Sequence, residues 1–319
     1  MVAISIMIEG QQGLTWPRWK RLVAEVEALG FAGLFRSDHF TGPNPPDEDA
    51  LEPIISLGYL ADRSERLHFG TLVAPVSFRD PIVLARQALA IDDLSNGRLI
   101  LGLGAGWQAR EHEMFGYTLG DIKTRFARFE EALEIVTRLL RDDARVTFDG
   151  RFYQLKDATF LPRPARPGGP RILIGGSGPR RTMPLAARYA DWWNGVGLDR
   201  AAFRERSGLL DRLLREHGRA PGDVRRTMMR TVHFGSDLAA VERRVAGKLR
   251  PDLADKPFEQ ALETLLSEER ALIGTPEMLI EQIRADGAAG VEELMLQWFD
   301  LDDIAGLRAF ATSVLPHVG

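Results

Sequence analysis

The sequence has no cysteine among its 319 residues. This absence excludes a disulfide framework, a thiolate metal site and a cysteine nucleophile. No run approaches the roughly 18 apolar residues of a membrane span, so no membrane partner is expected. Residues 1–10 are apolar over only a short span and carry no basic leader, so we expect no signal peptide and a cytoplasmic location.

An excess of charge of one sign is also missing. Lys and Arg number 41 and Asp and Glu number 45, and this gives a net charge of -4 at pH 7. The arginines alternate with acidic residues along the expected helices instead of forming blocks. The charge pattern therefore gives no reason to expect nucleic acid or an anionic membrane as a partner.

Two groups of motifs are absent as well. No GxxxxGK[ST] pattern occurs, so a nucleotide-hydrolysing P-loop is not expected. The sequence Glu111-His112-Glu113 looks like part of a metal site, but His112 has no histidine partner at HExxH or HxH spacing. We interpret it as a solvated helix start. A metal-dependent hydrolase needs several His and Asp residues at strand ends, and only Asp38 and His39 offer themselves, so no metal is expected.

Eight short apolar runs alternate with amphipathic helical segments along the chain. The runs typical of buried strands are residues 2–8, 33–36, 68–76, 98–103, 171–174, 192–196, 225–234 and 291–299. The segments with helical periodicity are residues 17–29, 51–63, 81–94, 123–141, 181–190, 203–217, 276–286 and 302–314. This alternation predicts a parallel sheet with right-handed crossovers, and eight units predict a (β/α)8 TIM barrel. We expect one domain over residues 1–319.

Two segments interrupt the alternation. Residues 146–164 contain FDGRFY, which predicts a hairpin inserted after the fourth helix. Residues 236–271 are largely charged and predict a helical insertion after the seventh strand.

The segment from Asp93 to Trp107 predicts a helix end, a buried strand and a glycine-rich loop. Gly97 is placed for the left-handed geometry that ends many helices. Gly104, Ala105 and Gly106 carry almost no side chain, so the backbone there can approach a flat ligand closely. The large ring of Trp107 suits a wall for that ligand, although ordinary loop packing explains it equally well. Barrels place their active sites at such strand ends.

A second glycine-rich loop follows the fifth expected strand. Gly175, Gly176, Ser177 and Gly178 free consecutive backbone N–H groups just before a helix start, and this pattern is typical of a phosphate site. Ser177 can add a hydroxyl donor, and Arg180 and Arg181 add positive charge. The alternative is a flexible turn without a ligand.

Asp38 and His39 follow the second expected strand. Because the carboxyl end of a barrel strand faces the active site, we expect His39 to line it. Its side chain titrates near neutrality and suits proton transfer. Asp38 could orient His39 or cap the next segment.

Four motifs in order resemble the bacterial luciferase-like family of flavin- and deazaflavin-dependent oxidoreductases. They are GFAGLFRSDHF (30–40), FGTLVAPVSFRDPIVLARQ (69–87), DDLSNGRLILGLGAGWQAREHEMFG (92–116) and ILIGGSGPRRTMPLAARYADWWN (172–194). Each motif includes an expected strand end. The C-terminal third of the chain agrees with the family in its barrel pattern only.

This resemblance implies a barrel that binds coenzyme F420 or FMN, with the ring across the strand ends and the phosphate on residues 175–178. It implies a non-proline cis peptide bond between Leu72 and Val73, so that Leu72, Val73 and Ala74 support the ring. The loop 104–107 and Asp38 belong to the implied cofactor site, and His39 lies beside the ring as the catalytic residue.

The GLGAGW sequence is similar to the deazaflavin branch and departs from the sugar-phosphate dehydrogenases, which carry Glu where Trp107 stands. We therefore predict an F420-dependent oxidoreductase that moves a hydride between the ring and a small molecule with a C=C, C=O or alcohol group. An FMN-dependent monooxygenase is the alternative, and a non-catalytic flavin-binding barrel is the alternative from another class. The resemblance also implies a homodimer.

Overall fold

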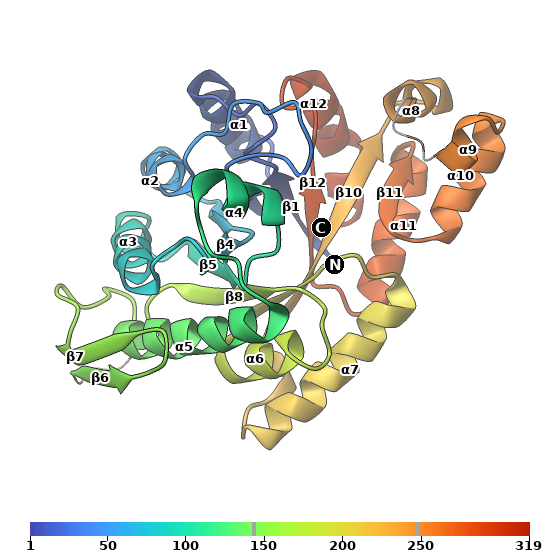
Figure 1. Ribbon diagram of the computed structural model, residues 1–319. Coiled ribbons are helices and arrows are strands. Elements are labelled where there is room, and N and C mark those ends of the chain that lie inside the picture. The colour runs from blue at the N-terminus through green and yellow to red at the C-terminus, as the bar shows by residue number, and fades with distance from the viewer. Residues whose placement is uncertain (142–144, 247–248, 250) are drawn as a thin grey trace.

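The computed structural model describes residues 1–141, 145–246, 249 and 251–319. At its centre is a closed barrel of eight parallel strands with helices packed around it (Figure 1). In order around the barrel the strands are β1 (Ala3–Ile8), β2 (Gly33–Arg36), β3 (His68–Thr71), β5 (Leu99–Gly104), β8 (Arg171–Gly175), β9 (Trp192–Gly195), β10 (Arg225–Phe234) and β12 (Glu293–Gln297). Pairing of β9 with β10 and of β12 with β1 closes the circle. The expected (β/α)8 barrel is confirmed.

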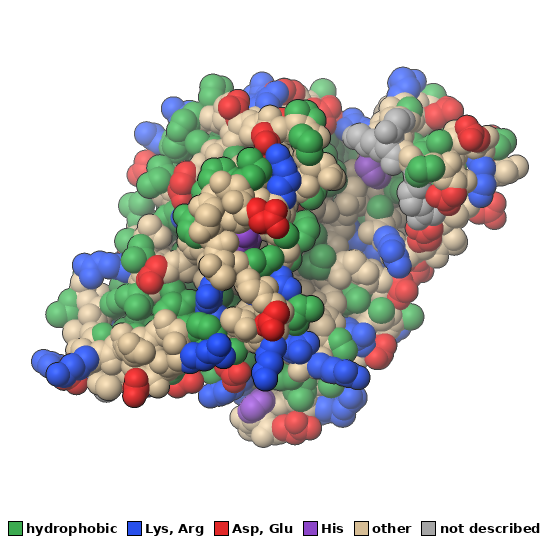
Figure 2. Space-filling view, in the orientation of Figure 1, with side chains coloured by type: hydrophobic (Ala, Val, Ile, Leu, Met, Phe, Trp, Pro, Cys, Tyr) green, Lys and Arg blue, Asp and Glu red, His purple; other side chains and the backbone are tan. Residues whose placement is uncertain are grey.

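The described helices surround this barrel. They are α1 (Trp16–Ala28), α2 (Pro53–Arg63), α3 (Pro81–Leu94), α4 (Ala109–Phe115), α5 (Ile122–Arg141), α6 (Thr182–Tyr189), α7 (Arg200–Glu216), α8 (Leu238–Val245), α9 (Pro251–Ala254), α10 (Phe258–Ser267), α11 (Pro276–Ala288) and α12 (Ile304–Ser313), with short 3₁₀ turns at Pro221–Asp223 and Leu315–His317. Within the described ranges, no helix has the length and apolar character needed to cross a membrane. Acidic and basic side chains are mixed over the visible face (Figure 2).

The sequence sets the helix ends by local hydrogen bonding. Before α3, the Asp80 carboxylate accepts hydrogen bonds from the N–H groups of Ile82 and Val83, while Pro81 occupies the first helical position. After α3, Gly97 has φ +83°, as its expected role in ending the helix requires. The chain then turns directly into β5, which places the loop after β5 at one end of the barrel.

The expected strand over residues 68–76 is divided in the structure. It forms β3 and the short β4 (Ala74–Pro75), and the peptide bond between Leu72 and Val73 that separates them is cis. The cis bond that the resemblance implied is therefore present. Both β3 and β4 pair with β5, so the interruption lies beside the glycine-rich end of β5.

Two further pieces lie outside the barrel. Strands β6 (Val146–Asp149) and β7 (Gln154–Ala158) pair as an antiparallel hairpin next to α5. After β10, helices α8, α9 and α10 lead to β11 (Ala271–Gly274), which pairs in parallel with β10 outside the ring. The sequence analysis expected a helical insertion over residues 236–271 and assigned no strand to the residues that directly follow it. Val241, Val245, Leu262 and Ile273 form a small separate core there.

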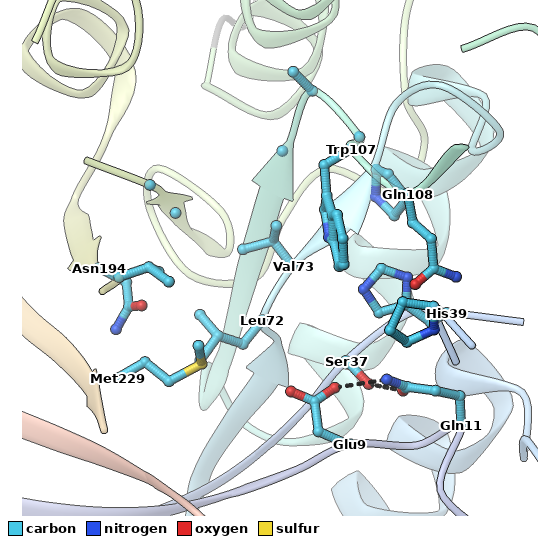
Figure 3. A pocket seen from close by; sticks show the side chains of 18 of the residues that line it. Glu9, Gln11, Ser37, His39, Leu72, Val73, Trp107, Gln108, Asn194 and Met229 are labelled. Atoms are coloured by element: carbon cyan, nitrogen blue, oxygen red, sulfur yellow. Dashed lines mark hydrogen bonds between the residues drawn. The ribbon is translucent and has the colours of Figure 1, made fainter. Parts of the chain in front are cut away.

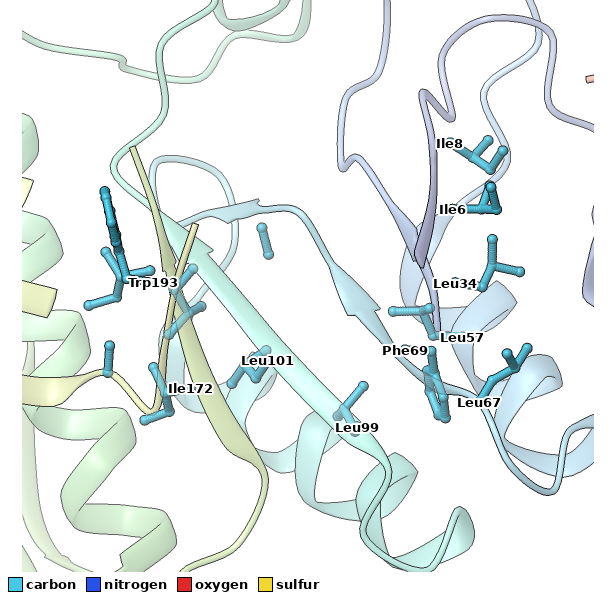
Figure 4. Close-up of a cluster of buried hydrophobic side chains, with 14 of the residues drawn as sticks. Ile6, Ile8, Leu34, Leu57, Leu67, Phe69, Leu99, Leu101, Ile172 and Trp193 are labelled. Atoms are coloured by element: carbon cyan, nitrogen blue, oxygen red, sulfur yellow. The ribbon is translucent and has the colours of Figure 1, made fainter. Parts of the chain in front are cut away.

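Alternation along the strands divides the core into two layers. In β1, Ile6 and Ile8 point out toward the helices, and this outer layer is drawn in Figure 4. Met7, between them in sequence, belongs to the inner cluster with Phe35, Ile100 and other side chains inside the barrel. Burial of each such side chain stabilises the fold by roughly 1.5–3 kcal/mol.

The N-terminal end of the barrel carries a polar network. The Glu293 carboxylate, which is fully buried, accepts hydrogen bonds from Ser5 Oγ at 2.5 Å and Arg225 Nε at 3.1 Å, and lies 2.7 Å from His68 Nε2. Burial raises the pKa of Glu293, but the contacts with His68, Ser5 and Arg225 outweigh burial, and the pKa is lowered. Beside this network is a hollow of about 870 Å³ lined mainly by charged and glycine residues.

Candidate active site

The C-terminal ends of the strands enclose a cavity of about 640 Å³. Nine of the thirteen residues expected in the site line it: His39, Leu72, Val73, Gly104, Ala105, Gly106, Trp107, Gly175 and Gly176. The other four, Asp38, Ala74, Ser177 and Gly178, lie just behind or beside this lining in sequence. The volume is in the range of sites that enclose organic ligands. Figure 3 shows the cavity wall from close by.

Val73 lies between the two glycine-rich loops. A Cβ atom at Gly104 would lie 2.6 Å from Val73 Cγ2, and one at Gly175 would lie 3.0 Å from Val73 Cγ1. The first distance is shorter than real Cβ contacts, so residue 104 must be glycine for Val73 to keep its place. The three residues therefore form one smooth wall, as Figure 3 shows for Val73.

The loop after β5 is fixed by its own backbone and by α5. Gly106 has φ +80°, and a Cβ there would collide with Ser77 Oγ. Arg125 Nη1 donates a hydrogen bond to the Gly106 carbonyl at 3.0 Å. Trp107 follows with 62% of its surface exposed, and its ring meets the His39 ring edge-on at 5.5 Å between centroids. The loop thus presents an uncovered indole to the cavity.

The loop after β8 has the expected glycine geometry. Gly176 has φ +120°, and its carbonyl accepts a hydrogen bond from Trp193 Nε1 at 2.8 Å. Ser177 Oγ donates to the Val196 carbonyl at 2.9 Å and accepts from the Val196 N–H at 3.0 Å. The hydroxyl hydrogen that was expected to serve an anion is therefore directed at the protein.

His39 is paired with a residue that the sequence analysis misjudged. His39 Nδ1 lies 2.9 Å from Glu111 Oε1, and Glu111 Oε2 accepts a hydrogen bond from the Phe40 N–H at 3.1 Å. Glu111 and His112 were expected at a solvated helix start, but they are only 1% and 2% exposed, so that prediction is wrong. Helix α4 turns both inward, and His112 bonds to Ser77 Oγ and the Gln108 carbonyl.

The charge of Glu111 controls the protonation of His39. Burial lowers the pKa of His39, but the hydrogen bond and negative charge of Glu111 outweigh this effect, and the pKa of His39 is raised from its ordinary value. Glu111 lies in the first turn of α4, where the helix dipole favours a carboxylate. The pair can therefore hold a proton at the cavity wall near neutral pH.

Asp38 serves a different partner from the one expected. Both its oxygens accept hydrogen bonds at 2.8 Å from Arg79, in a bidentate pair behind the cavity wall. Burial raises the pKa of Asp38 against the opposing effect of Arg79. Nearby Arg36 is fully buried, and burial lowers its pKa to about 10. Asp38 thus fixes the strand end that carries His39 and does not itself reach the ring of His39 in any hydrogen bond of the described residues.

Three buried polar atoms of lining residues have no hydrogen-bond partner among the described residues: Gln108 Oε1, Arg125 Nε and Asn194 Oδ1. Buried polar atoms are paired in the great majority of proteins, so unpaired atoms need an explanation. All three residues belong to the lining of the cavity, so these atoms lie just behind its polar wall. Gln108 and Arg125 were not anticipated from sequence, because an amide or guanidinium inside a helical or loop segment has no distinctive pattern.

A row of hydrogen bonds holds a carboxylate at the β1 side of the cavity. Glu9 accepts from Gln297 Nε2 at 2.7 Å and from Gln11 Nε2 at 3.0 Å. Ser37 Oγ donates a hydrogen bond to Gln11 Oε1 at 2.7 Å. Figure 3 shows Glu9, Gln11 and Ser37 near His39. Within the described residues, no group of three or more metal-ligating side chains occurs, here or elsewhere.

Comparison with known proteins identifies the family. Residues 2–293 match the profile described as luciferase-like monooxygenase, and the chain belongs to this family. A curated relative from Microbacterium testaceum, named F420-dependent glucose-6-phosphate dehydrogenase, is 31% identical over 92% of this chain and 90% of its own. One of the same name from Intrasporangium calvum is 29% identical over 91% of both chains.

Solved structures share the fold over the whole chain. An F420-dependent secondary alcohol dehydrogenase, in complex with an F420–acetone adduct, superposes with a TM-score of 0.82 at 20% identity and covers 100% of this chain and 99% of its own. A monooxygenase from Streptomyces bottropensis superposes with a TM-score of 0.78 at 22% identity and covers 100% of both chains. At these identities the likeness establishes the barrel fold.

Proposed function

We propose that this chain is an F420-dependent oxidoreductase that transfers a hydride between the deazaflavin ring and a small organic substrate. The observation that carries the proposal is the His39–Glu111 pair, which holds a proton in a cavity whose walls are glycine loops and an exposed indole. The names of the curated relatives support F420 as the cofactor.

Several features support a bound ring and its phosphate. Val73 and Gly104 make a smooth wall where a flat ring can lie, and the polar residue Asn194 lines the same cavity. The loop 175–178, followed by α6 and the exposed Arg180 and Arg181, suits a phosphate. The remaining expected contacts, Leu72, Ala74, Ala105, Gly106 and Trp107, and the supporting Asp38, complete the proposed cofactor site.

When bound, coenzyme F420 supplies a hydride from one ring carbon or, in its oxidised form, accepts one from an alcohol. Reduction of a carbonyl needs that hydride at carbon and a proton at oxygen. His39 donates the proton, and Glu111 stabilises its protonated form beforehand. In the opposite direction His39 takes the proton from an alcohol. Hydride transfer would require the cavity to bring the reacting carbon atoms within about 3–3.5 Å of each other.

An FMN-dependent monooxygenase remains the second candidate, because the family profile carries that description and a monooxygenase shares the fold. The exposed Trp107 beside His39 favours the deazaflavin branch, in which this tryptophan occurs. The proposal extends to a cytoplasmic location, expected from the sequence pattern, and to assembly as a homodimer, which rests on the family resemblance.

Titration of the purified protein with F420 and with FMN, followed by ring fluorescence, tests the cofactor. We expect F420 to bind more tightly than FMN. Tight binding of FMN without binding of F420 would overturn the proposal. Turnover of reduced F420 with an enone, compared with a sample without enone, then separates an enzyme from a silent cofactor-binding barrel, which would give no difference.

A further inference from the structure

We propose that the substrate is an uncharged carbonyl compound or alcohol with a flat apolar body, and that Glu9 excludes phosphorylated and carboxylated molecules. This inference rests on the proposed function and adds to it the chemical class of the substrate. It follows from the charges and apolar surfaces of the cavity.

Four charged side chains line the cavity in the described part of the chain: Glu9, His39, Glu111 and Arg125. Protonated His39 is balanced by Glu111 at 2.9 Å. Arg125 donates to the Gly106 carbonyl, on the α5 side of the loop, so it is engaged away from β1. Glu9, at the β1 side of the cavity, forms no ion pair with a cation among the described residues, although its charge also helps to raise the pKa of His39.

The surrounding amides hold the Glu9 carboxylate in place. Gln297 Oε1 accepts a hydrogen bond from Thr231 Oγ1 at 2.9 Å, and Gln11 Oε1 accepts one from Ser37 Oγ. Each amide oxygen is thus occupied, so each amide NH₂ group is turned toward Glu9. These two hydrogen bonds fix the carboxylate oxygens of Glu9 at the cavity wall. A phosphate or carboxylate placed near it meets a like charge that costs binding energy.

The mouth of the cavity, by contrast, is apolar. Trp107, Ile122 and Val196 line it and are 62%, 51% and 39% exposed. Exposed large apolar side chains gathered around a cavity mark a surface for an apolar ligand. The exposed indole of Trp107 has surface for stacking, and its ring makes a T-shaped contact with the His39 ring. A flat substrate on Trp107 can therefore direct its oxygen toward His39.

This assignment separates the chain from its curated relatives, whose names refer to glucose-6-phosphate. A sugar phosphate carries about two negative charges at neutral pH. It also has little apolar surface for Trp107 and Ile122. At about 30% identity over the whole chain, a change of substrate within the same reaction type is compatible with the shared fold.

The test uses protein loaded with oxidised F420 and three probes: benzaldehyde, 4-carboxybenzaldehyde and glucose-6-phosphate. Dissociation constants come from calorimetry or saturation-transfer NMR, and turnover of reduced F420 is a second readout. We expect benzaldehyde to bind about tenfold more tightly than 4-carboxybenzaldehyde or glucose-6-phosphate. In Glu9→Gln, the dissociation constants of benzaldehyde and 4-carboxybenzaldehyde should differ by about threefold or less, because the charged 4-carboxybenzaldehyde binds more tightly once the like charge is removed.

Matched variants control for changes unrelated to the cavity. Glu205→Gln removes the same charge from an exposed site on α7 and should leave the ratio unchanged. Trp107→Ala should weaken the binding of benzaldehyde about fivefold, because the stacking contact is lost. Trp16→Ala is the control: Trp16 packs on Tyr59, and its loss should leave the binding of benzaldehyde unchanged. The inference is overturned if glucose-6-phosphate binds as tightly as benzaldehyde. It is also overturned if Glu9→Gln leaves the ratio of the benzaldehyde and 4-carboxybenzaldehyde dissociation constants unchanged. Loss of F420 binding in the loading step overturns the proposed function instead, so the two failures are distinguishable.

Discussion

The two ends of the barrel have similar features, but they differ in how completely their buried polar groups are hydrogen-bonded. Each end has a hollow, of about 640 Å³ at the C-terminal end and about 870 Å³ at the N-terminal end. Each has a histidine–glutamate pair with a buried carboxylate: His39 with Glu111 at 2.9 Å, and His68 with Glu293 at 2.7 Å. Neither size nor the presence of such a pair therefore identifies the active site.

The difference lies in the neighbouring groups. Ser5 and Arg225 satisfy Glu293 further, so the N-terminal pair stabilises the closure of the barrel. Around the C-terminal cavity, three buried polar atoms lack a partner, whereas of the side chains lining the N-terminal hollow only Arg166 contributes one among the described residues. Unpaired polar groups beside a glycine wall are typical of a ligand site, whereas a saturated hydrogen-bond network is typical of a structural one.

The largest effect is expected from His39→Ala. Loss of the proton donor should lower turnover about 10²-fold or more while F420 affinity changes by about twofold or less. Steady-state kinetics and fluorescence titration measure the two quantities. His68→Ala is the matched control at the other end and should keep its turnover per folded molecule. Equal turnover in His39→Ala and the unaltered protein would remove His39 from the mechanism.

Breaking the N-terminal pair should affect stability instead of turnover. Glu293→Ala leaves His68 and the partly buried Arg225 without their carboxylate, and we expect the free energy of unfolding to fall by about 3 kcal/mol. Urea denaturation measures this change. A variant as stable as the unaltered chain, or one that is folded but inactive, would contradict the division between the two ends.

The glycine wall is tested by Gly104→Ala. The added Cβ would lie 2.6 Å from Val73 Cγ2, so Val73 must shift into the cavity, and F420 affinity should fall about tenfold. Gly58→Ala is the control, because nothing lies within 4 Å of a Cβ in that helix, and it should stabilise the fold by up to about 1 kcal/mol. Unchanged F420 affinity in Gly104→Ala would show that the ring does not lie on this wall.

The smallest predicted effect is a shift in pH dependence. Because Glu111 raises the pKa of His39, Glu111→Gln should let His39 lose its proton at lower pH. Carbonyl reduction requires protonated His39, so its decline with rising pH should begin at lower pH in the variant. The same pair stabilises the fold fully below the unfolded pKa of about 6.5 and loses this contribution as pH rises through the raised folded pKa. NMR titration of His39 checks the shift, and an unmoved profile would contradict it.

The sequence predicted the barrel because eight apolar runs alternate with helices, and the length of each element limits the possible topologies. It predicted the positions of the loops 104–107 and 175–178 because each glycine-rich stretch follows a buried apolar run, and barrels place their sites at such strand ends. His39 could be predicted in the same way, because it follows the end of the second expected strand.

Contacts between residues far apart in the sequence could not be predicted from local sequence patterns. Glu111 looked solvated because its neighbours in sequence are charged, and only the approach of α4 to the end of β2 buries it against His39. Strand β11 was missed because its short apolar run follows a charged helical segment, and its pairing with β10 is a tertiary contact. The partner of Asp38, Arg79, lies 41 residues away in sequence.

A crystal structure of the protein with F420 bound tests the central claim most directly, because it reports which end of the barrel holds the cofactor. The account predicts density for the ring against Val73 and Gly104, with the phosphate on the loop 175–178 and His39 facing the ring. Density for F420 in the N-terminal hollow beside His68, or a ring that lies away from Val73 and His39, would contradict it.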